Sequence, residues 1–517
     1  MARRLLVAGS NSGCQLGVGH DDDAPTFHEA LCRIDGQDRA TSFPPAGYTV
    51  VEISSGANHT LAMLQPVGDG RCTTGASTQS EIWVAGTGTQ GQLGPAHVLP
   101  TSKPMDVFTR LDLQACLENV AGLPLSSLSE ASLEPKLIAC GWNCSYLVLT
   151  PRSGARTSAS DQDVLISLGL HRDNTFGELG STTNTSADGA ASCVHMTSFA
   201  GVLVEAGLDA STPFRIADVA AGLRHAVVAL SVDVGSDGQA RAIVAGWGSA
   251  RQGQVGRIPE AASRRPGLSK RPGPAAAIVL EPQLIFDWKT RAKCKVKAGR
   301  DHTVVLIQGQ KGDLEDALHC IGSNKQGQLL DASVLPAHKL AEEGIADVTC
   351  NWTGTHLLTR QQGILSCGNN SRGQLGTGSI QTDGPLSLVD LTTVLQQHQV
   401  STSTDDASLR SSLLTSKVTV QKLVSGSEHS LLLAGRHTTT PSSEDSHRLP
   451  TSTQVWGWGW NEHGNLAQGE HDEADRDRPV LLLDGTRYGA AQPKYTPLDI
   501  WAGCGTTFIL VDKPNTT

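Results

Sequence analysis

The 517-residue chain is poor in the residues that build large apolar cores and long helices. Aromatic side chains make up 4% of it, methionine occurs four times, and charged residues account for 18%. Glycine, in contrast, occurs 55 times. This balance is typical of many short strands joined by tight turns, and it argues against a bundle of long helices.

Long apolar runs are also missing. No stretch approaches the roughly 18 consecutive apolar residues of a membrane-spanning helix. The N-terminal segment 1–9 has two arginines and then five apolar residues, too few for the apolar part of a secretory signal. We therefore expect no membrane association. The twelve cysteines include no Cys-x-x-Cys pair and mostly lie in strand-like segments, so we expect reduced, buried thiols in a cytoplasmic and nuclear protein.

The net charge and the absence of catalytic motifs argue against two further classes of protein, nucleic-acid binders and enzymes. The formal net charge of −10 argues against a general nucleic-acid binder, because phosphate contacts need a clustered positive surface, and we expect no direct DNA binding. The chain contains no Gly-x-Ser-x-Gly, His-Glu-x-x-His or phosphate-loop motif. We therefore predict a protein that is not an enzyme and has no cofactor.

Two short patterns recur along the chain, and they decide the architecture. The first is a glycine-rich turn, clearest as Gly368-Asn-Asn-Ser-Arg-Gly-Gln-Leu-Gly376. Its copies begin at Gly9, Gly86, Gly169, Gly248, Gly322, Gly368 and Gly459. The second has the form Ala-Gly-x-x-His-Thr-x-x-Leu and can be placed at Gly56, Gly141, Gly222, Gly299, Asn351, Gly426 and Gly503. Each unit can bury its apolar face only against neighbouring units, so the repeats must stack or close into a ring.

The spacing of the second pattern indicates inserted loops. Successive copies lie 85, 81, 77, 52, 75 and 77 residues apart, and only the 52-residue interval approximates a minimal four-stranded unit. Where a glycine-rich turn ends in Gln-Leu-Gly, the glutamine side chain is expected to bond exposed backbone. We predict one domain over residues 1–517, with polar inserts at about 181–212, 257–274, 401–416 and 436–453 that bury too little apolar surface to be ordered.

The histidine position of the second pattern raises the question of a metal. It holds His59, His225, His302 and His429, whereas the other copies hold Cys144, Gly354 and Thr506. Because three of seven positions cannot supply the same ligand, a metal ring is disfavoured. We interpret the four histidines as structural anchors that fasten the turn of their own unit through a backbone hydrogen bond, and we predict no metal site.

A tryptophan cluster is the best candidate for a partner contact. Trp456, Trp458 and Trp460 alternate with glycine, so a strand would place all three on one face. One or two of these rings could pack between repeat units, but large rings on one face are also plausible interface anchors. We predict a partner interface formed by the following residues of the last and first turns: Trp458, Trp460, Asn461, Glu462, His463, His20 and Asp21.

The paired patterns resemble the RCC1 repeat, and the resemblance covers essentially the whole chain. It implies an all-β fold, a seven-bladed β-propeller. Two stretches, Gly9–Asp23 and Trp456–Asn465, are similar to the fungal alpha-tubulin suppressor family, RCC1-like proteins also known as Elongator-linked killer-toxin-insensitivity factors. The chain departs from that family at Leu466-Ala467, where Cys-Gly is expected.

The resemblance implies a non-catalytic scaffold that binds a small CSL-type zinc-finger protein of diphthamide synthesis. Through that partner, and indirectly through Elongator, it would support modification of wobble uridines in tRNA and diphthamide formation on elongation factor 2. Two alternatives stay open. One is a guanine nucleotide exchange factor for a Ran-like small GTPase, and the other is a substrate adaptor of unknown target.

Overall fold

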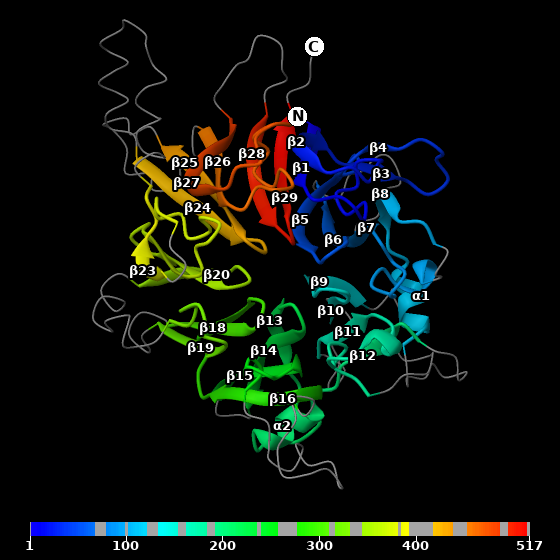
Figure 1. Cartoon of the computed structure of the whole chain (residues 1–517). Coiled ribbons are helices and arrows are strands. Elements are labelled where there is room, and N and C mark those ends of the chain that lie inside the picture. The colour runs from blue at the N-terminus through cyan, green and yellow to red at the C-terminus, as the bar shows by residue number, and fades with distance from the viewer. Residues whose placement is uncertain are drawn as a thin grey trace, which may run out of the picture.

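Seven sheets, antiparallel except for the pair β3 (Leu31–Arg33) and β8 (Met105–Arg110), surround a central axis in the computed structural model of the chain (Figure 1). The structure describes residues 2–67, 79–98, 102–120, 133–152, 162–182, 192–234, 239–256, 277–309, 316–330, 344–380, 384–391, 417–437, 452–485 and 495–513. Helix in these residues is limited to α1 (Leu113–Glu118), α2 (Ala200–Glu205) and the 3-10 turns η1 (Pro95–His97) and η3 (His171–Asp173). The prediction of an all-β, seven-bladed propeller is confirmed.

Each sheet forms one blade, and we number the blades I to VII in the chain order of their innermost strands. Blade I has β5 (Tyr48–Ser55), β6 (His59–Pro66), β7 (Glu81–Gly86) and β8 (Met105–Arg110), extended by β3 (Leu31–Arg33) and β4 (Thr41–Ser42). Blade II has β9 (Leu133–Cys140), β10 (Ser145–Pro151), β11 (Val164–Leu168) and β12 (Val194–Met196). Blade III has β13 (Arg215–Ala221), β14 (His225–Val234), β15 (Gln239–Ser249) and β16 (Ile278–Trp288).

The remaining blades follow the same order from the central axis outward. Blade IV has three described strands, β17 (Lys293–Ala298), β18 (His302–Gln308) and β19 (Ala317–Gly322). Blade V has β20 (Ile345–Cys350), β21 (Gly354–Thr359), β22 (Ile364–Gly368) and β23 (Gly384–Leu388). Blade VI has β24 (Lys417–Ser425), β25 (His429–His437), β26 (Ser452–Gly459) and β27 (Arg476–Asp484). Blade VII combines β28 (Thr496–Ala502) and β29 (Thr506–Lys513) with β1 (Ala2–Gly9) and β2 (Ala24–Glu29).

Blade VII closes the ring, because it is built from both ends of the chain (Figure 1). Strand β29 pairs with β1 in an unbroken antiparallel register from Ala2↔Lys513 to Gly9↔Thr506. The sequence repeat and the blade are therefore offset. The strand before each glycine-rich turn is the third strand of one blade, whereas the next copy of the second pattern begins the following blade. This offset makes the first and last strands of the chain mutually dependent.

A complete ring of hydrogen bonds joins each blade to the next. The acceptor is the backbone carbonyl of the residue just before the leucine of the glycine-rich turn. In blade III a valine takes the place of this leucine. Five blades reach it with the hydroxyl that follows the histidine position, at 2.6–2.8 Å: Thr60 to Gln15, Ser145 to Gln92, Thr303 to Gln254, Thr355 to Gln328 and Thr507 to Asn465. In blades III and VI an indole N–H takes this role, from Trp247 to Glu178 and from Trp458 to Gln374.

The glycine-rich turns are held by their own polar side chains. In the blade V turn, Gln374 Oε1 accepts from the backbone N–H of Arg372 at 2.7 Å, and Asn370 Oδ1 accepts from that of Leu375 at 3.0 Å. Equivalent glutamines cap backbone in four other turns: Gln15, Gln92, Gln254 and Gln328. The expected bond from the glutamine to backbone is formed in these five turns, but the backbone donors are buried or part-buried rather than exposed. The bond satisfies donors that the tight turn leaves unpaired.

The glycine of the second pattern is needed because two blades meet at it. A Cβ on Gly299 would lie 2.0 Å from Cε1 of His302 in its own blade and 2.6 Å from the carbonyl of Asn351 in the next. In blade V the arrangement is exchanged: the glycine stands at 354, and the side chain of Asn351 fills the space that a histidine ring takes elsewhere. Glycine and histidine therefore form one packing unit.

Each of the three blades that lack the histidine has a buried aromatic ring two positions later. These rings are Tyr146, His356 and Phe508, all 0% exposed. Tyr146 donates to the Glu178 carbonyl at 2.6 Å, and Nε2 of His356 lies 3.4 Å from the Ser430 hydroxyl of blade VI. At the same position, the blades with the histidine have smaller aliphatic residues: Leu61, Val227, Val304 and Leu431.

The described part of the polar insert predicted at residues 181–212 contains regular secondary structure. This part holds β12 and α2, because Phe199, Val202 and Leu203 are apolar at helical spacing and bury against blade III. Residues 257–274 and 401–416 lie outside the described residues. The described ends of 436–453 belong to strands β25 and β26, and the rest of that insert also lies outside the described residues.

The sequence analysis also made predictions about the cysteines and about membrane-spanning helices. Eleven of the twelve cysteines are described, all as free thiols and nine of them buried. Burial raises the pKa of most of them, for example that of Cys140 to about 12, so these thiols are poor nucleophiles. Among the described helices, none has the length and apolarity needed to cross a bilayer.

Candidate functional site: the signature face and its rim

Both repeat patterns lie on one face of the propeller, which we call the signature face. In blade VII the backbone N–H of Ser10, in the glycine-rich turn, donates to the carbonyl of Gly505, in the second pattern, at 2.8 Å. The same contact recurs in blades I, III, IV, V and VI. A Cβ on Gly9, where φ is +108°, would lie 2.1 Å from the Gly505 carbonyl oxygen, so this approach requires glycine. The turns that the sequence marks as special therefore share one surface.

The predicted partner residues converge where blades VI and VII meet on this face. The Nδ1 atom of His463 lies 2.7 Å from Asp23 Oδ2, which joins the last glycine-rich turn to the first. The Trp460 ring packs edge-on against His463 with centroids 5.1 Å apart, and its Nε1 donates to Glu462 at 3.0 Å. We call Trp460, Glu462, His463 and Asp23 the rim cluster.

Two of the predicted contacts are wrong, because the structure buries them completely. Trp458 is 0% exposed, packs in the core between blades V and VI, and donates its indole N–H to blade V. Asn461 is also 0% exposed: its side chain accepts from the backbone of Leu466 and donates to that of Asp472. Trp456 and Trp458 share one face of β26 as predicted, but that face is core, and only Trp460, beyond the end of the strand, reaches solvent.

His20 and Asp21 lie in the first glycine-rich turn, beside the rim cluster. The buried Asn11 fixes this turn by donating to the carbonyls of His20 at 2.7 Å and Asp22 at 3.1 Å. As a result the side chains of Asp21 and Asp22 project into solvent. The described residues include no group of three or more His, Cys, Asp or Glu side chains arranged to hold a metal ion.

The rim has a strong charge of one sign. Segments 10–23 and 460–475 together contain eight carboxylates and no lysine or arginine. Arg372 of blade V approaches Asp475 at 3.3 Å and Glu462 at 3.7 Å, and Arg476 pairs with Asp472. The other carboxylates make no ion pair with a lysine or arginine in the part of the chain that is described: Asp21, Asp22, Asp23, Glu470 and Glu473. The rim is therefore suited to a basic partner surface.

The four histidines predicted as anchors are buried between blades, and three of them reach across to the next blade. Nε2 of His225 lies 3.1 Å from the Thr303 hydroxyl, and the equivalent distances are 3.2 Å for His302 to Thr355 and His429 to Thr507. Because each threonine donates its only proton to a turn carbonyl, the histidine must be the donor. The structure thus differs from the expected backbone bond within one blade. His59 makes no hydrogen bond of normal geometry.

This bonding pattern keeps the histidines neutral. With Nε2 as donor, Nδ1 carries the lone pair, and it is buried without a partner in His225, His302 and His429. Burial lowers the pKa of His59, His302 and His429 to about 4 and that of His225 to about 3. Rings of this kind are structural, because a proton added at Nδ1 would meet no acceptor.

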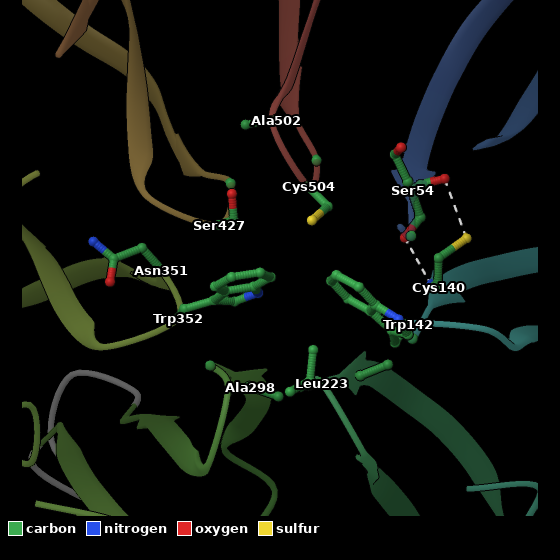
Figure 2. Close-up of a pocket in the computed structure, with 18 of the residues that line it drawn as sticks. Ser54, Cys140, Trp142, Leu223, Ala298, Asn351, Trp352, Ser427, Ala502 and Cys504 are labelled. Atoms are coloured by element: carbon green, nitrogen blue, oxygen red, sulfur yellow. Dashed lines mark hydrogen bonds between the residues drawn. The ribbon is translucent and has the colours of Figure 1, made fainter. Parts of the chain in front are cut away.

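Sequence reasoning missed a second feature of the signature face, at its centre. The residue after the first position of the second pattern lines the central cavity in every blade except IV, where it is Arg300, and in blades II and V it is a tryptophan. Trp142 and Trp352 meet across the central axis with ring centroids 5.7 Å apart (Figure 2). They border a cavity of about 170 Å³, which Leu223, Ser427 and Cys504 also line. We call this feature the axial dish. The sequence could have revealed this feature. The residue after the first position of the second pattern is equivalent in all seven copies, and two of these equivalent residues are tryptophans.

Comparison with known proteins agrees with this architecture. The chain is 23% identical over 528 residues to a secretion-regulating guanine nucleotide exchange factor of Bos taurus, covering 99% of this chain and 84% of that protein. It is 21% identical over 519 residues to an RCC1 repeat-containing protein of Schizosaccharomyces pombe, covering 98% and 99%. Prp20p of Saccharomyces cerevisiae, studied for its binding to Gsp1p and histones, has a similar structure with a TM-score of 0.58 at 13% identity, over 99% of this chain and 92% of that one. No family model matches the sequence.

Fold and site together define a closed seven-bladed propeller, a fold that the chain shares with Prp20p. The relatives support the RCC1-repeat family as the one to which the chain is similar. They do not distinguish the fungal alpha-tubulin suppressor subgroup from other RCC1-like proteins.

Proposed function

We propose that this protein is a non-catalytic scaffold that binds a protein partner through the rim cluster of blades VI and VII. The observation that carries the proposal is the exposed group formed by Trp460, His463 and Asp23 within an acidic surface. A partly exposed tryptophan beside charged groups is the composition of an interface hot spot. Burial raises the pKa of the described thiols and lowers that of the four anchor histidines, so these groups are protonated and neutral, respectively, and are poor catalytic candidates.

The partner we propose is the small CSL-type zinc-finger protein of diphthamide synthesis. Support comes from the two stretches that resemble the alpha-tubulin suppressor family, Gly9–Asp23 and Trp456–Asn465, which are adjacent on the rim. In this proposal the complex acts in the cytoplasm and nucleus, on Elongator-dependent tRNA modification and on diphthamide formation.

Binding of the purified CSL-type protein should depend on the rim cluster. Trp460→Ala is expected to weaken binding roughly 30-fold, since a desolvated aromatic hot spot contributes about 2 kcal/mol or more. Glu462→Lys should weaken binding with little effect on folding, because this side chain is 56% exposed. Isothermal titration calorimetry measures the affinities, and thermal melting checks the fold.

Two matched variants control this experiment. Trp458→Ala truncates the buried neighbour and should lower stability by roughly 3–5 kcal/mol. Glu118→Lys reverses an exposed charge on α1, far from blades VI and VII in sequence, and should leave both binding and melting unchanged. Equal binding by wild type, Trp460→Ala and Glu462→Lys would remove the rim cluster as the interface.

A guanine nucleotide exchange factor is the second candidate, because the relatives from Bos taurus and Mus musculus bear that name and align with 99% and 93% of this chain. If the scaffold proposal is right, catalytic amounts of the protein will not accelerate release of labelled nucleotide from a Ran-type GTPase. Loss of nucleotide well above the spontaneous rate would favour exchange activity instead.

A further inference from the structure

The axial dish has the size and chemistry to receive one aromatic side chain. The dish is an open depression of about 170 Å³, close in volume to an engineered cavity of about 150 Å³ that binds benzene. Its walls are the faces of Trp142 and Trp352, the Leu223 side chain and the Cys504 thiol (Figure 2). The Ser427 hydroxyl, 2% exposed, has no hydrogen-bond partner of normal geometry. A phenyl ring can pack edge-to-face against these tryptophan rings, whereas an aliphatic chain cannot, so the dish favours an aromatic side chain.

The dish is continuous with the acidic rim. Cys504 lines the dish, and the next residue, Gly505, lies under the Trp460 ring: a Cβ there would be 3.4 Å from Trp460 Cζ3. Trp460 belongs to the rim cluster, and beyond it lie the eight carboxylates of segments 10–23 and 460–475, five of which make no ion pair with a lysine or arginine among the described residues. A segment whose aromatic side chain enters the dish therefore has its flanking residues beside negative charge.

We propose that the axial dish binds a protruding segment of a partner protein that carries one phenylalanine-like side chain flanked by lysine or arginine. The aromatic ring fills the space beside Trp142 and Trp352, and the basic residues contact the acidic rim. This inference rests on the proposed protein-binding function, and it adds a second contact site together with the chemistry of the segment that fills it.

The test uses the full chain and a synthetic peptide, acetyl-Lys-Lys-Gly-Phe-Gly-Lys-Lys-amide, titrated by calorimetry. Replacing its phenylalanine by alanine, or its lysines by glutamate, should each weaken binding at least tenfold. On the protein, Trp352→Ala should also weaken binding at least tenfold. Ala57→Phe, which fills the dish from blade I, should do the same without removing any core residue. Trp288→Ala is the matched control, because Trp288 is partly exposed and stacks on Phe286 in blade III rather than in the dish.

Several outcomes would overturn the proposal. These are no binding of the peptide to wild type, equal affinity of the phenylalanine and alanine peptides, and unchanged affinity in both Trp352→Ala and Ala57→Phe. Self-association of wild type that Trp352→Ala abolishes would assign the dish to a second copy of this chain. The peptide assay is independent of the CSL-type protein. If the peptide binds but the CSL-type protein does not, the proposed dish stands and the proposed partner is refuted. If the CSL-type protein binds but the peptide does not, only the proposed dish is refuted.

Discussion

The protein is expected to lose stability steeply as the pH falls from about 6.5 toward 4. Burial lowers the pKa of His59, His302, His356 and His429 to about 4 and that of His225 to about 3. In the unfolded chain these rings bind protons near their ordinary pKa of about 6.5, so the unfolded state holds more protons throughout this window. Acid therefore favours unfolding, by about 1.4 kcal/mol per pH unit for each histidine.

Five such histidines give a slope of roughly 7 kcal/mol per pH unit near pH 5.5. Since domains are stable by about 5–15 kcal/mol, the acid transition should lie between about pH 4 and pH 6. Burial raises the pKa of Glu52, Glu178 and Glu428, and their protonation in the folded state opposes this trend at the acid end. They are fewer than the histidines, so the net direction does not change.

Urea unfolding at a series of pH values measures this dependence. His225→Gln should remove one titrating group and reduce the slope by about 1.4 kcal/mol per pH unit, although it lowers stability at pH 7. His471→Gln changes an exposed histidine and should leave the slope unaltered. The interpretation fails if stability is flat between pH 7 and pH 5, or if His225→Gln has the slope of wild type.

Truncation after Gly505 should abolish cooperative folding of the whole propeller. The deletion removes β29 from between β28 and β1, including four side chains that are at most 4% exposed: Phe508, Ile509, Leu510 and Val511. At about 1.5–3 kcal/mol each, they contribute roughly 6–12 kcal/mol, comparable with the total stability of a domain. The truncation also leaves β1 and β28 without the neighbouring strand to which each is hydrogen-bonded. Circular dichroism during heating should show no sharp transition.

A circular permutant is the matched control for the truncation. Joining Lys513 to Ala2 by a short linker keeps the β29–β1 pair, and new termini between Thr290 and Arg291 open the connection between blades III and IV. This protein should melt cooperatively near the wild-type temperature. A truncated chain that still melts cooperatively at an unchanged temperature would show that the C-terminal strand is dispensable.

Local patterns predicted much of the turn chemistry. The role of Gln374 as a backbone cap followed from its place beside glycines in a tight turn, because such a bond involves only near neighbours in sequence. The surface position of Glu462 and His463 followed in the same way. The burial of Trp458 and Asn461 could not be predicted in this way. Trp458 is buried against blade V, and Asn461 is buried by a loop that returns to it at Asp472, eleven residues later in the chain. Alternation along β26 showed which residues share a face, but it carried no information on which face is covered.

The recurrence of two signatures by itself determined seven repeated units that stack or close into a ring, because a repeated unit can bury its apolar side only against copies of itself. The resemblance to the RCC1 repeat selected the seven-bladed propeller from these two possibilities. Tertiary structure alone decided how the ring closes, since the β29–β1 register joins residues about 500 positions apart along the chain. It also decided which neighbours replace a missing histidine, and that Trp142 and Trp352 meet at the axis. Those contacts lie between blades, where distance along the chain gives no indication of distance in space.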